Sequence, residues 1–581
     1  MNLRPCVLFG GAALFVVQLA SAQTASPQSD PVFDAMQTEM KRTMSLSLQK
    51  LEKPYFASYS IDTGHEWAAT AVMGGLLGVT SEPFRYPAMQ LRVGDYNFDQ
   101  TNYAGGGMRG ASYSLSGFPL DDDPSVIRQY LWLETDAAYK ADLEAIARKR
   151  AALRSVTVSE QLPDFAPAKP TTLLENGPAI KFDDKTWNDR ARRISAIFND
   201  YPNLRASVAD YTAIDAVHRF VSSEGSVIRI PQSEGQFQIR ASAQAPDGMI
   251  LRDAALFYTN DISKMFSEAE LTKAAKSVAE NVTKLAAAPM GENYSGPILF
   301  EGVASAQLMA EILGRNLHIN RKPTGAGAGN PTELEGRRGV RIMPEMFDVT
   351  DDPTLPMFGH TEVDDEGVPS APISLVEKGV LKDFLRTRTP VRGYNESNGR
   401  ALLGGTAAPT NLIIKAHETT SVAELKKKMI DLCQQRGLNY AIIIRKMDFP
   451  STAAGDEMRR LMGGGAGGAR AVSMPLYVYK LYTDGREEMI RGVKLRGVNA
   501  RSLKDILAAG DDEVTLNYLE NGAPFAQVGG GGYTAEVSVV APSVLIDDLE
   551  LTKMEDELPK LPVAPSPMLS QSALPPNAPQ R

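Results

Sequence analysis

A single carboxylate, Glu301, lies where an apolar run gives way to an alanine-rich stretch. The run Ile298 to Phe300 has the character of a short strand, and the residues after Gly302 follow a helical pattern. Such a strand end is a frequent place for binding and catalytic side chains. The junction contains neither histidine nor cysteine, so Glu301 is its one candidate reactive group.

Three consecutive acidic residues, Asp364, Asp365 and Glu366, form a second candidate group ahead of Gly367-Val368-Pro369. Their carboxylates could bind a hard cation. The surrounding sequence lacks the alternating oxygen ligands of a calcium loop, however, and its glycine and proline favour a solvated turn that leads into a strand. We therefore expect a turn.

The other residues that could do chemistry are scattered. No pair of histidines has metal-ligand spacing on a helix, so each is expected to be a surface or core residue. Cys433 has no histidine near it in sequence and is expected to be a small core residue. A Ser-His-Asp arrangement stays open because triads assemble from distant residues, although no Gly-x-Ser-x-Gly motif supports one. The histidines are His65, His218, His318, His360 and His417.

Two glycine-rich segments, residues 463–468 and 529–532, could in principle bind phosphate. Neither continues into Gly-Lys-Ser/Thr, and neither has the strand, turn and helix spacing of a dinucleotide site. We expect both segments to be flexible or tightly turned loops.

The first 22 residues have the pattern of a secretory signal peptide. Arg4 precedes a mostly apolar run from Cys6 to Ala20, and Ala20-Ser21-Ala22 forms a small-residue cleavage site. No later segment approaches ~18 consecutive apolar residues, so no membrane span is expected after the signal is removed. The sequence thus predicts export to a periplasm or to the outside of the cell.

Length and charge restrict the fold and the partners. Removal of residues 1–22 from the 581-residue chain leaves 559, more than a single core usually holds, so at least two domains are expected. The loss of Arg4 takes the formal charge from −9 to −10. An acidic surface argues against a nucleic-acid or anionic-membrane partner.

Residues 23–265 have the order of helices and strands of a mixed α/β domain. Helices are expected to begin at Asp30-Pro31 and at Asp123-Pro124, and a third helix is expected over 186–201. Strands follow over 206–245, with turns expected at Ser223-Glu224-Gly225 and at Ser233-Glu234-Gly235.

A second domain is expected over residues 266–557. It opens with a helix that Ser267 and Glu270 cap, and then becomes rich in short strands. One further helix begins at Ser421 and ends at Gly437. From residue 558 to 581 the composition is rich in proline, serine and alanine, which predicts a disordered tail.

The segment 363–369 (VDDEGVP), followed by 375–382 (LVEKGVLK), resembles the DDEGVP…ENGxLK signature of the TldD/PmbA family, also called modulators of DNA gyrase. Weaker similarities lie in the family's order and extend the resemblance from about Arg205 to Leu551. Residues 30–150 resemble the N-terminal region of an exported branch. The weaker matches are residues 223–225, 245–249, 404–412, 492–497 and 542–549.

The resemblance implies an α+β protein with a mixed α/β N-terminal domain and a β-rich C-terminal domain, paired into dimers around an enclosed cavity. Its TldD-type member is a zinc metallopeptidase that acts on unfolded or short peptides and pairs with a zinc-less partner of the same fold. A His-Glu-x-x-x-His motif and a cysteine near the C-terminus bind the zinc, and the glutamate activates water.

Carried over residue by residue, the motif falls on residues 300–305 (FEGVAS). Phe300 and Ser305 stand at the two histidine positions, and only the expected base, Glu301, is retained. The cysteine position falls near 525–528 (FAQV), where there is none. We therefore expect no metal and no other cofactor.

Two functional hypotheses follow from the resemblance. The first is an exported protein without the zinc site that binds unfolded or short peptides, or that pairs with a zinc-bearing TldD/PmbA-type homologue or with itself. The alternative is an active peptide hydrolase, with zinc, in which Glu301 works with His360 or with the carboxylates of 364–366. A purely structural envelope protein would bind no peptide at all.

Overall fold

The computed structural model describes residues 30–48, 50–103, 118–154, 162–177, 180–325, 332–402, 405–450, 472–520, 535–555 and 557–569. The predicted signal peptide, both glycine-rich segments and the expected cysteine position lie outside the described residues.

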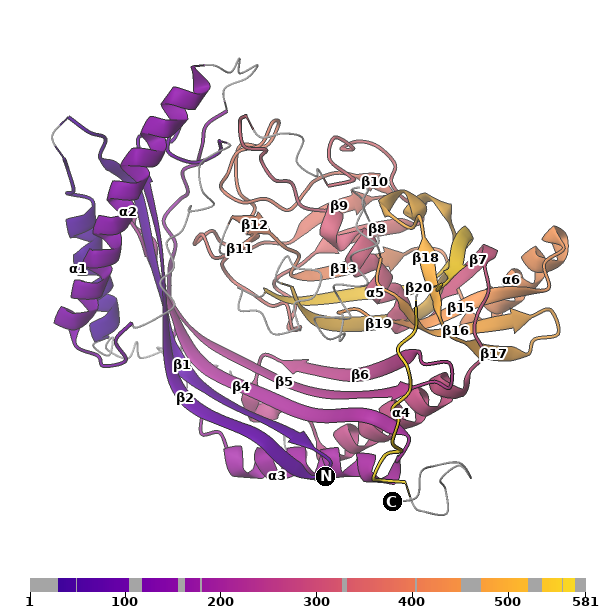
Figure 1. Cartoon of the computed structure of the whole chain (residues 1–581). Helices are drawn as coiled ribbons and strands as arrows, with labels where there is room; N and C mark the ends of the chain where they lie inside the picture. The colour runs from indigo at the N-terminus through magenta and orange to yellow at the C-terminus, as the bar shows by residue number, and fades with distance from the viewer. Residues whose placement is uncertain are drawn as a thin grey trace, which may run out of the picture.

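A long, strongly curved sheet forms the first layer and bends around the rest of the molecule (Figure 1). Its strands follow the order β2, β1, β4, β5, and both β3 and β6 pair with β5. All neighbours are antiparallel except β3 and β5. The strands are β1 (Pro54–Val72), β2 (Gly75–Val93), β3 (Thr172–Leu174), β4 (Leu204–Ser222), β5 (Val227–Gln244) and β6 (Ile250–Thr259).

Side chains of this sheet alternate between an outer face covered by helices and an inner face turned toward the second layer. On β1, Tyr59 and Trp67 pack in the two apolar clusters beneath the helices. On the opposite face, Phe220 contacts Val363 of the second layer, and the Tyr258 ring lies 5.3 Å from that of Phe358. The inner face is therefore the side on which a site between the layers could form.

The helices on the outer face begin at the residues that the sequence predicts. The side chains of Asp30, Asp123 and Ser267 accept hydrogen bonds from the first turns of α1 (Pro31–Thr43), α2 (Pro124–Leu153) and α4 (Glu268–Ala287). Ser267 and Glu270 form the predicted capping box. The helix expected over 186–201 is α3 (Asp184–Ala196) with a 3-10 turn, η1 (Ile197–Asp200).

A mixed sheet forms the second layer, in the order β10, β9, β8, β13, β20, β7, β15, β16, β17. Strands β18 and β19 also pair with β20, and β14 pairs with β19. The strands are β7 (Tyr294–Phe300), β8 (Phe347–Asp351), β9 (Ile373–Glu377), β10 (Val380–Leu381), β13 (Asn411–Ala416), β14 (Thr419–Thr420), β15 (Tyr440–Met447), β16 (Pro475–Tyr482), β17 (Glu487–Ile490), β18 (Val493–Arg496), β19 (Ile506–Glu520) and β20 (Ala535–Lys553), with a separate pair β11 (Ala401–Leu402) and β12 (Thr406–Ala407).

Helices α5 (Val303–Ile312) and α6 (Val422–Arg436) cover opposite faces of this sheet. Phe300 packs in the large cluster that contains α5, whereas Leu299 packs with Met429 and Cys433 of α6. Cys433 is thus the buried core residue that the sequence predicts. Gly437 ends α6 in the left-handed conformation (φ 68°), as expected for a glycine C-cap. The α+β class, with a β-rich C-terminal part, is confirmed.

The boundary between the layers lies later than the predicted 265/266. Helix α4 buries Leu271, Ala275 and Val278 against strands of the first sheet. By its packing this helix belongs to the first layer, which then ends near Ala288.

The predicted tail also begins later than residue 558. Leu558 packs beside Met249, and the Gln244 side chain donates a hydrogen bond to the Pro559 carbonyl at 3.1 Å. The first residues after 557 are therefore part of the folded first layer. Residues 570–581 lie outside the described residues.

The turn predicted at Ser233-Glu234-Gly235 is wrong. These residues lie within β5, where Glu234 pairs with Ile214 of β4 and Gly235 also pairs with Thr259 of β6. Their composition is typical of a turn, but pairing with both neighbours keeps the backbone extended. The turn predicted at 223–225 is confirmed, because it connects β4 to β5.

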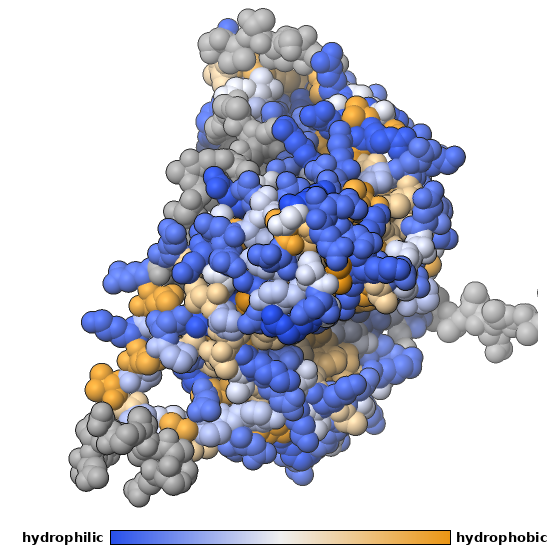
Figure 2. All heavy atoms as spheres, turned by 90° about the vertical axis from the view of Figure 1, so that its right-hand side faces the viewer, coloured by the Kyte–Doolittle hydropathy of each residue, from blue (hydrophilic) through white to orange (hydrophobic). Residues whose placement is uncertain are grey.

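None of the helices in the described residues is long and apolar enough to cross a membrane. Hydrophilic residues cover most of the face in Figure 2, with hydrophobic residues gathered in smaller areas between them. Polar side chains thus dominate the contact with solvent on this side.

Candidate functional site

The junction that carries Glu301 forms as the sequence predicts, at the end of a central strand. β7 lies between β20 and β15 and ends at Phe300, and α5 begins at Val303. Gly302 has a φ of 62°, which a glycine adopts at little cost, so the chain can reverse within two residues. Its amide donates a hydrogen bond to Ser543 Oγ at 2.8 Å, which fixes the turn to β20.

The Glu301 side chain points to the α6 side of the sheet, because it continues the alternation that places Leu299 there. Arg445 Nε lies 3.2 Å from Glu301 Oε1, and Lys426 Nζ of α6 lies 3.3 Å from Oε2. The same two cations also pair with Glu487 at 2.8 and 3.1 Å. Glu301 is therefore one member of a four-residue ion-pair cluster.

The residues at the two histidine positions are committed to structural contacts. The Phe300 ring is fully buried in the core, and its hydrocarbon offers no metal ligand. The Ser305 hydroxyl is also buried and donates a hydrogen bond to the Pro542 carbonyl at 2.6 Å. With Glu301 held by two cations, these residues do not fit a catalytic zinc ion.

Among the described residues, no group of three or more histidine, cysteine, aspartate or glutamate side chains is arranged to hold a metal ion. Cys433 lies buried within α6, in the cluster that also contains Leu299. Burial raises the pKa of its thiol, which keeps it protonated and unreactive near neutral pH.

Histidine and aspartate pair at two places, but no catalytic triad forms among the described side chains. His218 Nδ1 lies 2.6 Å from Asp62, and His417 Nε2 lies 2.7 Å from Asp348. Neither histidine has a serine hydroxyl as a second partner in the described part of the chain. His360 hydrogen-bonds to the Pro353 carbonyl at 2.8 Å rather than to Glu301.

The acidic segment 364–366 forms a turn, as expected, but the turn is not solvated as predicted, because Asp364 is buried where the two layers meet. Asp364 Oδ1 accepts hydrogen bonds from the amides of Glu366 and Val368 at 3.0 and 2.9 Å, and Oδ2 accepts one from Ala401 at 2.9 Å. Burial, with the neighbouring Glu366, raises the pKa of Asp364 to about 8. Both carboxylate oxygens of Asp364 therefore accept hydrogen bonds from backbone amides and are not placed to bind a cation.

Arg388 connects this turn to the first layer. Its amide donates to Glu366 Oε2 at 2.7 Å, and its guanidinium donates to Glu224 Oε1 at 2.6 Å. The guanidinium also lies 4.1 Å from the Phe165 ring centre and 4.8 Å from that of Phe56. This fully buried arginine therefore contacts both a carboxylate and two aromatic rings of the first layer.

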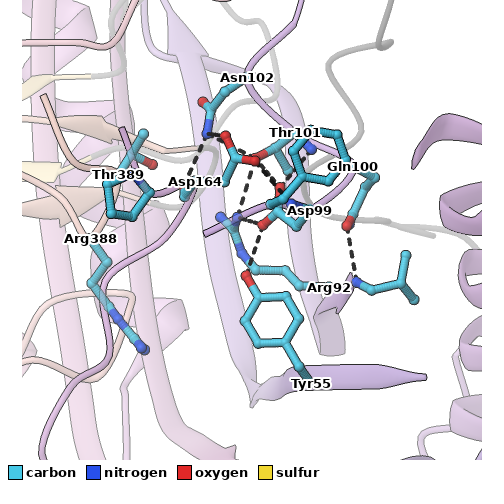
Figure 3. A network of polar contacts seen from close by, with 12 residues as sticks. Tyr55, Arg92, Asp99, Gln100, Thr101, Asn102, Asp164, Arg388 and Thr389 are labelled. Carbon is cyan, nitrogen blue, oxygen red and sulfur yellow. Dashed lines mark hydrogen bonds and ion pairs between the residues drawn. The ribbon is translucent and has the colours of Figure 1, made fainter. Parts of the chain in front are cut away.

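A second polar network lies next to Arg388 (Figure 3). Arg92 Nη1 and the Tyr55 hydroxyl donate to the same oxygen of Asp99, at 2.7 and 2.8 Å. Lys149 of α2 forms an ion pair with Asp164. Arg321, from the second layer, lies 3.3 Å from the same aspartate, so this network also holds the layers together.

A cavity of about 520 Å³ lies between the two layers, on the α5 side of the second sheet. The first layer contributes β6 from Asp253 to Tyr258 and the middle of α4. The second layer contributes Val303 and Gln307 of α5, residues 447–450 and Thr515 to Asn517. This size and its mixture of apolar walls with a few polar groups are typical of ligand sites. The cavity is our candidate functional site.

Buried polar contacts fix the walls of the cavity. Arg252 Nη2 lies 2.5 Å from Asp448, and Lys446 Nζ lies 2.5 Å from Asp253, which also accepts a hydrogen bond from Tyr477. These contacts connect β6 to β15 and β16. They therefore set the distance between the two layers at the cavity.

Gln307 of α5 fixes the segment after β15. Its side-chain amide donates to the carbonyls of Met447 and Phe449 at 3.0 and 2.6 Å, and its oxygen accepts from the Met447 amide at 2.7 Å. A glutamine within the alanine-rich helix was the one sequence signal that could have indicated this role. The other lining residues come from segments too far apart in sequence to be grouped.

A family model covers the part of the chain that contains Glu301 and the acidic turn at 364–366. Residues 293–446 match the family model described as the PmbA/TldA metallopeptidase C-terminal domain. A metalloprotease of Archaeoglobus fulgidus is 38% identical over 90 residues, and one of Methanothermobacter thermautotrophicus is 25% identical over 183 residues. These alignments cover 15% and 32% of this chain but only 21% and 39% of the relatives' lengths.

Solved structures show that the fold extends over nearly the whole chain. A protein of Thermotoga maritima described as a modulator of a DNA gyrase superposes with a TM-score of 0.56 at 16% identity, over 86% of this chain and 96% of that one. TldE of Thermococcus kodakarensis gives 0.56 at 11% identity, over 89% and 100%. The family model and the metalloprotease relatives support a relation to the metallopeptidase-related TldD/PmbA family, and the solved structures show the shared fold.

Proposed function

We propose that this chain is a TldD/PmbA-family protein without a zinc site that binds unfolded or short peptides in the cavity between its layers. The observation that carries the proposal is the state of residues 300–305. Phe300 is core, Ser305 is bonded to β20, and Glu301 is neutralised by Arg445 and Lys426. These contacts support the absence of a zinc site at the positions that the resemblance assigns to the ligands.

The cavity supports binding without chemistry at Glu301, because the two lie on different sides of the second sheet. Val303 and Gln307 of α5 line the cavity, whereas Glu301 faces α6. A volume of about 520 Å³ accommodates a few side chains of a peptide. An extended chain could also meet the backbone of β6, which forms one wall.

The alternative, a hydrolase with a site rearranged around Glu301, is favoured by the retention of Glu301 alone. The two cations within ion-pair distance of Glu301, Lys426 and Arg445, also form ion pairs with Glu487. The acidic turn at 364–366 is bonded to the backbone and to Arg388, and His360 to Pro353. The carboxylates needed for such a site are thus used elsewhere.

We further propose that the protein acts after export and as one subunit of a pair, either with a zinc-bearing homologue or with itself. The signal-peptide pattern of residues 1–22 supports export. The loss of the zinc positions in a metallopeptidase-related fold supports a partner role. Purification from the native host, followed by mass spectrometry, should recover either a homologue with His-Glu-x-x-x-His or a homodimer, and a lone monomer would contradict the pairing.

Peptide binding is tested with a fluorescein-labelled unstructured peptide and the purified mature protein. We expect a rise in anisotropy and no cleavage by mass spectrometry, with Glu301→Gln indistinguishable from the wild type. Ser277→Phe, at an exposed position of α4 that lines the cavity, should weaken binding about tenfold or more by filling it.

The matched control is Ala147→Phe, which adds the same ring at an exposed position of α2 far along the chain. It should leave binding unchanged. Cleavage that Glu301→Gln abolishes would establish the hydrolase instead. Equal binding by both phenylalanine variants would show that the cavity is not the site.

A further inference from the structure

The inner face of the first sheet carries a row of carboxylates that form no ion pair with a cation among the described residues. Glu82 of β2 lies opposite Glu66 of β1. Glu66 also lies opposite Ile214 of β4, and Ile214 in turn lies opposite Glu234 of β5. Residues directly opposite each other on neighbouring strands share a face. All three glutamates therefore point toward the second layer, away from the helices.

A fourth carboxylate faces this row from the second layer. Glu536 of β20 lies opposite Leu519 of β19, and Leu519 packs against Tyr258 of β6. Tyr258 lies opposite Gln236 on β5, two residues from Glu234 on the same face. Glu536 and Glu234 thus approach one another across the gap between the layers. We call Glu82, Glu66, Glu234 and Glu536 the acidic track.

The charges of the acidic track are not neutralised within the described part of the chain. Ion pairs between the layers and across the sheet involve other acids, such as Asp210 with Arg240 and Asp62 with His218. Burial, and then the charge of Glu66, raises the pKa of Glu234 to about 7. Burial and Glu234 raise the pKa of Glu536 well above its usual range. A cation bound between Glu234 and Glu536 would stabilise the ionised form of both carboxyl groups.

An independent observation at the inner end of the track indicates a ligand. The Tyr258 side chain is 7% exposed, and its hydroxyl has no hydrogen-bond partner among the described residues. A buried hydroxyl without a partner costs free energy, so such groups are usually satisfied by a ligand or by water. Tyr258 also lines the cavity, so the track leads from exposed Glu82 at the sheet edge to the cavity itself.

The spacing of the carboxylates favours an extended ligand with several positive charges. Glu66 and Glu234 are separated by β4, which places their strands roughly 10 Å apart. No group of three or more such residues arranged to hold a metal ion occurs in the described ranges. The side chains of lysine or arginine can reach separate carboxylates from one extended backbone.

We propose that the acidic track selects basic peptides, binding lysine or arginine side chains at Glu66, Glu234 and Glu536 while a neighbouring residue enters the cavity. This inference rests on the proposed peptide-binding function and adds the class of peptide. Half-buried carboxylates act on such side chains more strongly than exposed ones, because solvent screens them less.

The test compares a lysine-rich, a neutral and a glutamate-rich fluorescein-labelled peptide of equal length on the mature protein. The lysine-rich peptide should bind best, and the double variant Glu66→Gln/Glu234→Gln should weaken it about tenfold while leaving the neutral peptide unaffected. Tyr258→Phe keeps the ring packing and should weaken binding about threefold. The control Glu418→Gln removes an exposed carboxylate from the turn between β13 and β14 and should change nothing.

The variants are expected to fold, because neutralising carboxylates that repel one another leaves thermal unfolding unchanged or shifts it upward. Equal affinity for the lysine-rich and neutral peptides, or full retention of lysine-rich binding in the double variant, would overturn the acidic-track proposal and leave peptide binding standing. If no peptide of any composition binds, both this proposal and the proposed function fail.

Discussion

At the residue scale, Glu301 keeps the position of the motif's glutamate, and we propose that it does not keep the catalytic role. The carboxylate stands at the predicted strand end, yet Arg445 and Lys426 hold it on the side of the sheet opposite the cavity. Its position could be predicted from the local sequence because a glycine turn follows an apolar strand. Its partners could not, because they come from α6 and β15, more than a hundred residues away.

Asp142 of α2 provides a test of the buried charges in the first layer. The residue is 7% exposed, and burial together with the charge of Asp99 raises the pKa of its carboxyl to about 8. The folded state therefore holds the proton more tightly than the unfolded state does. Stability should fall as pH rises from about 4 to about 8, where this carboxyl ionises in the folded protein.

Asp142→Asn should remove this part of the pH dependence. Above pH 8 the variant should be more stable than the wild type, on the order of a few kcal/mol, and near pH 4 the two should be similar. Urea unfolding at a series of pH values measures the difference. A variant that is less stable at every pH would show that the ionised carboxylate stabilises the fold.

At the element scale, local sequence signals predicted helix ends better than strands. The capping residues Asp30, Asp123, Ser267 and Ser421 and the terminating Gly437 all act as expected, because a cap depends on only a few neighbours. The apolar, strand-like runs of the sequence near 55–61 and 89–96 mark only the two ends of a much longer hairpin, β1 and β2.

The middle of these strands could not be recognised from the sequence, because of the residues on their inner face. Its residues, Glu66 and Glu234 among them, are polar although they lie within a sheet, because they face the gap between the layers and not a core. Ser233-Glu234-Gly235 was mistaken for a turn for the same reason. Gly235 is needed there because a side chain would meet Thr259, Met265 and Ile262 at 3.0 to 3.3 Å.

The acidic turn that carries the family signature should be stabilised by close contact with β4. Gly367 has a φ of 75°, and a Cβ there would lie 2.6 Å from the Phe220 ring. Gly393 has a similar φ of 81° but open space around it. Gly367→Ala should cost about 3 kcal/mol or more, whereas Gly393→Ala should cost about 1 kcal/mol from backbone strain alone.

Chemical denaturation of both alanine variants checks this difference. Because the two glycines share their backbone conformation, the excess cost at Gly367 measures the packing of the turn on Phe220. Equal costs would mean that the signature turn contributes backbone geometry only and does not depend on its contact with the first layer.

At the scale of the whole molecule, the two layers are joined by buried charges and by small apolar clusters rather than by one continuous core. Arg388, the Asp164 network and the Arg252–Asp448 pair connect them, and the cavity lies where β6 and α5 face each other. The class and the two-layer organisation could be predicted from the resemblance of the sequence to its family. The cavity could not, because its walls come from distant segments that meet only in the fold.

The central claim, that this chain binds peptide without a zinc ion, is tested most directly by titrating one unstructured lysine-rich peptide into two samples of the mature protein. One sample is stripped of metal with a chelator and the other is supplied with equimolar zinc. The account predicts the same affinity in both and an intact peptide afterwards. Cleavage that appears only with zinc and is lost in Glu301→Gln would contradict it.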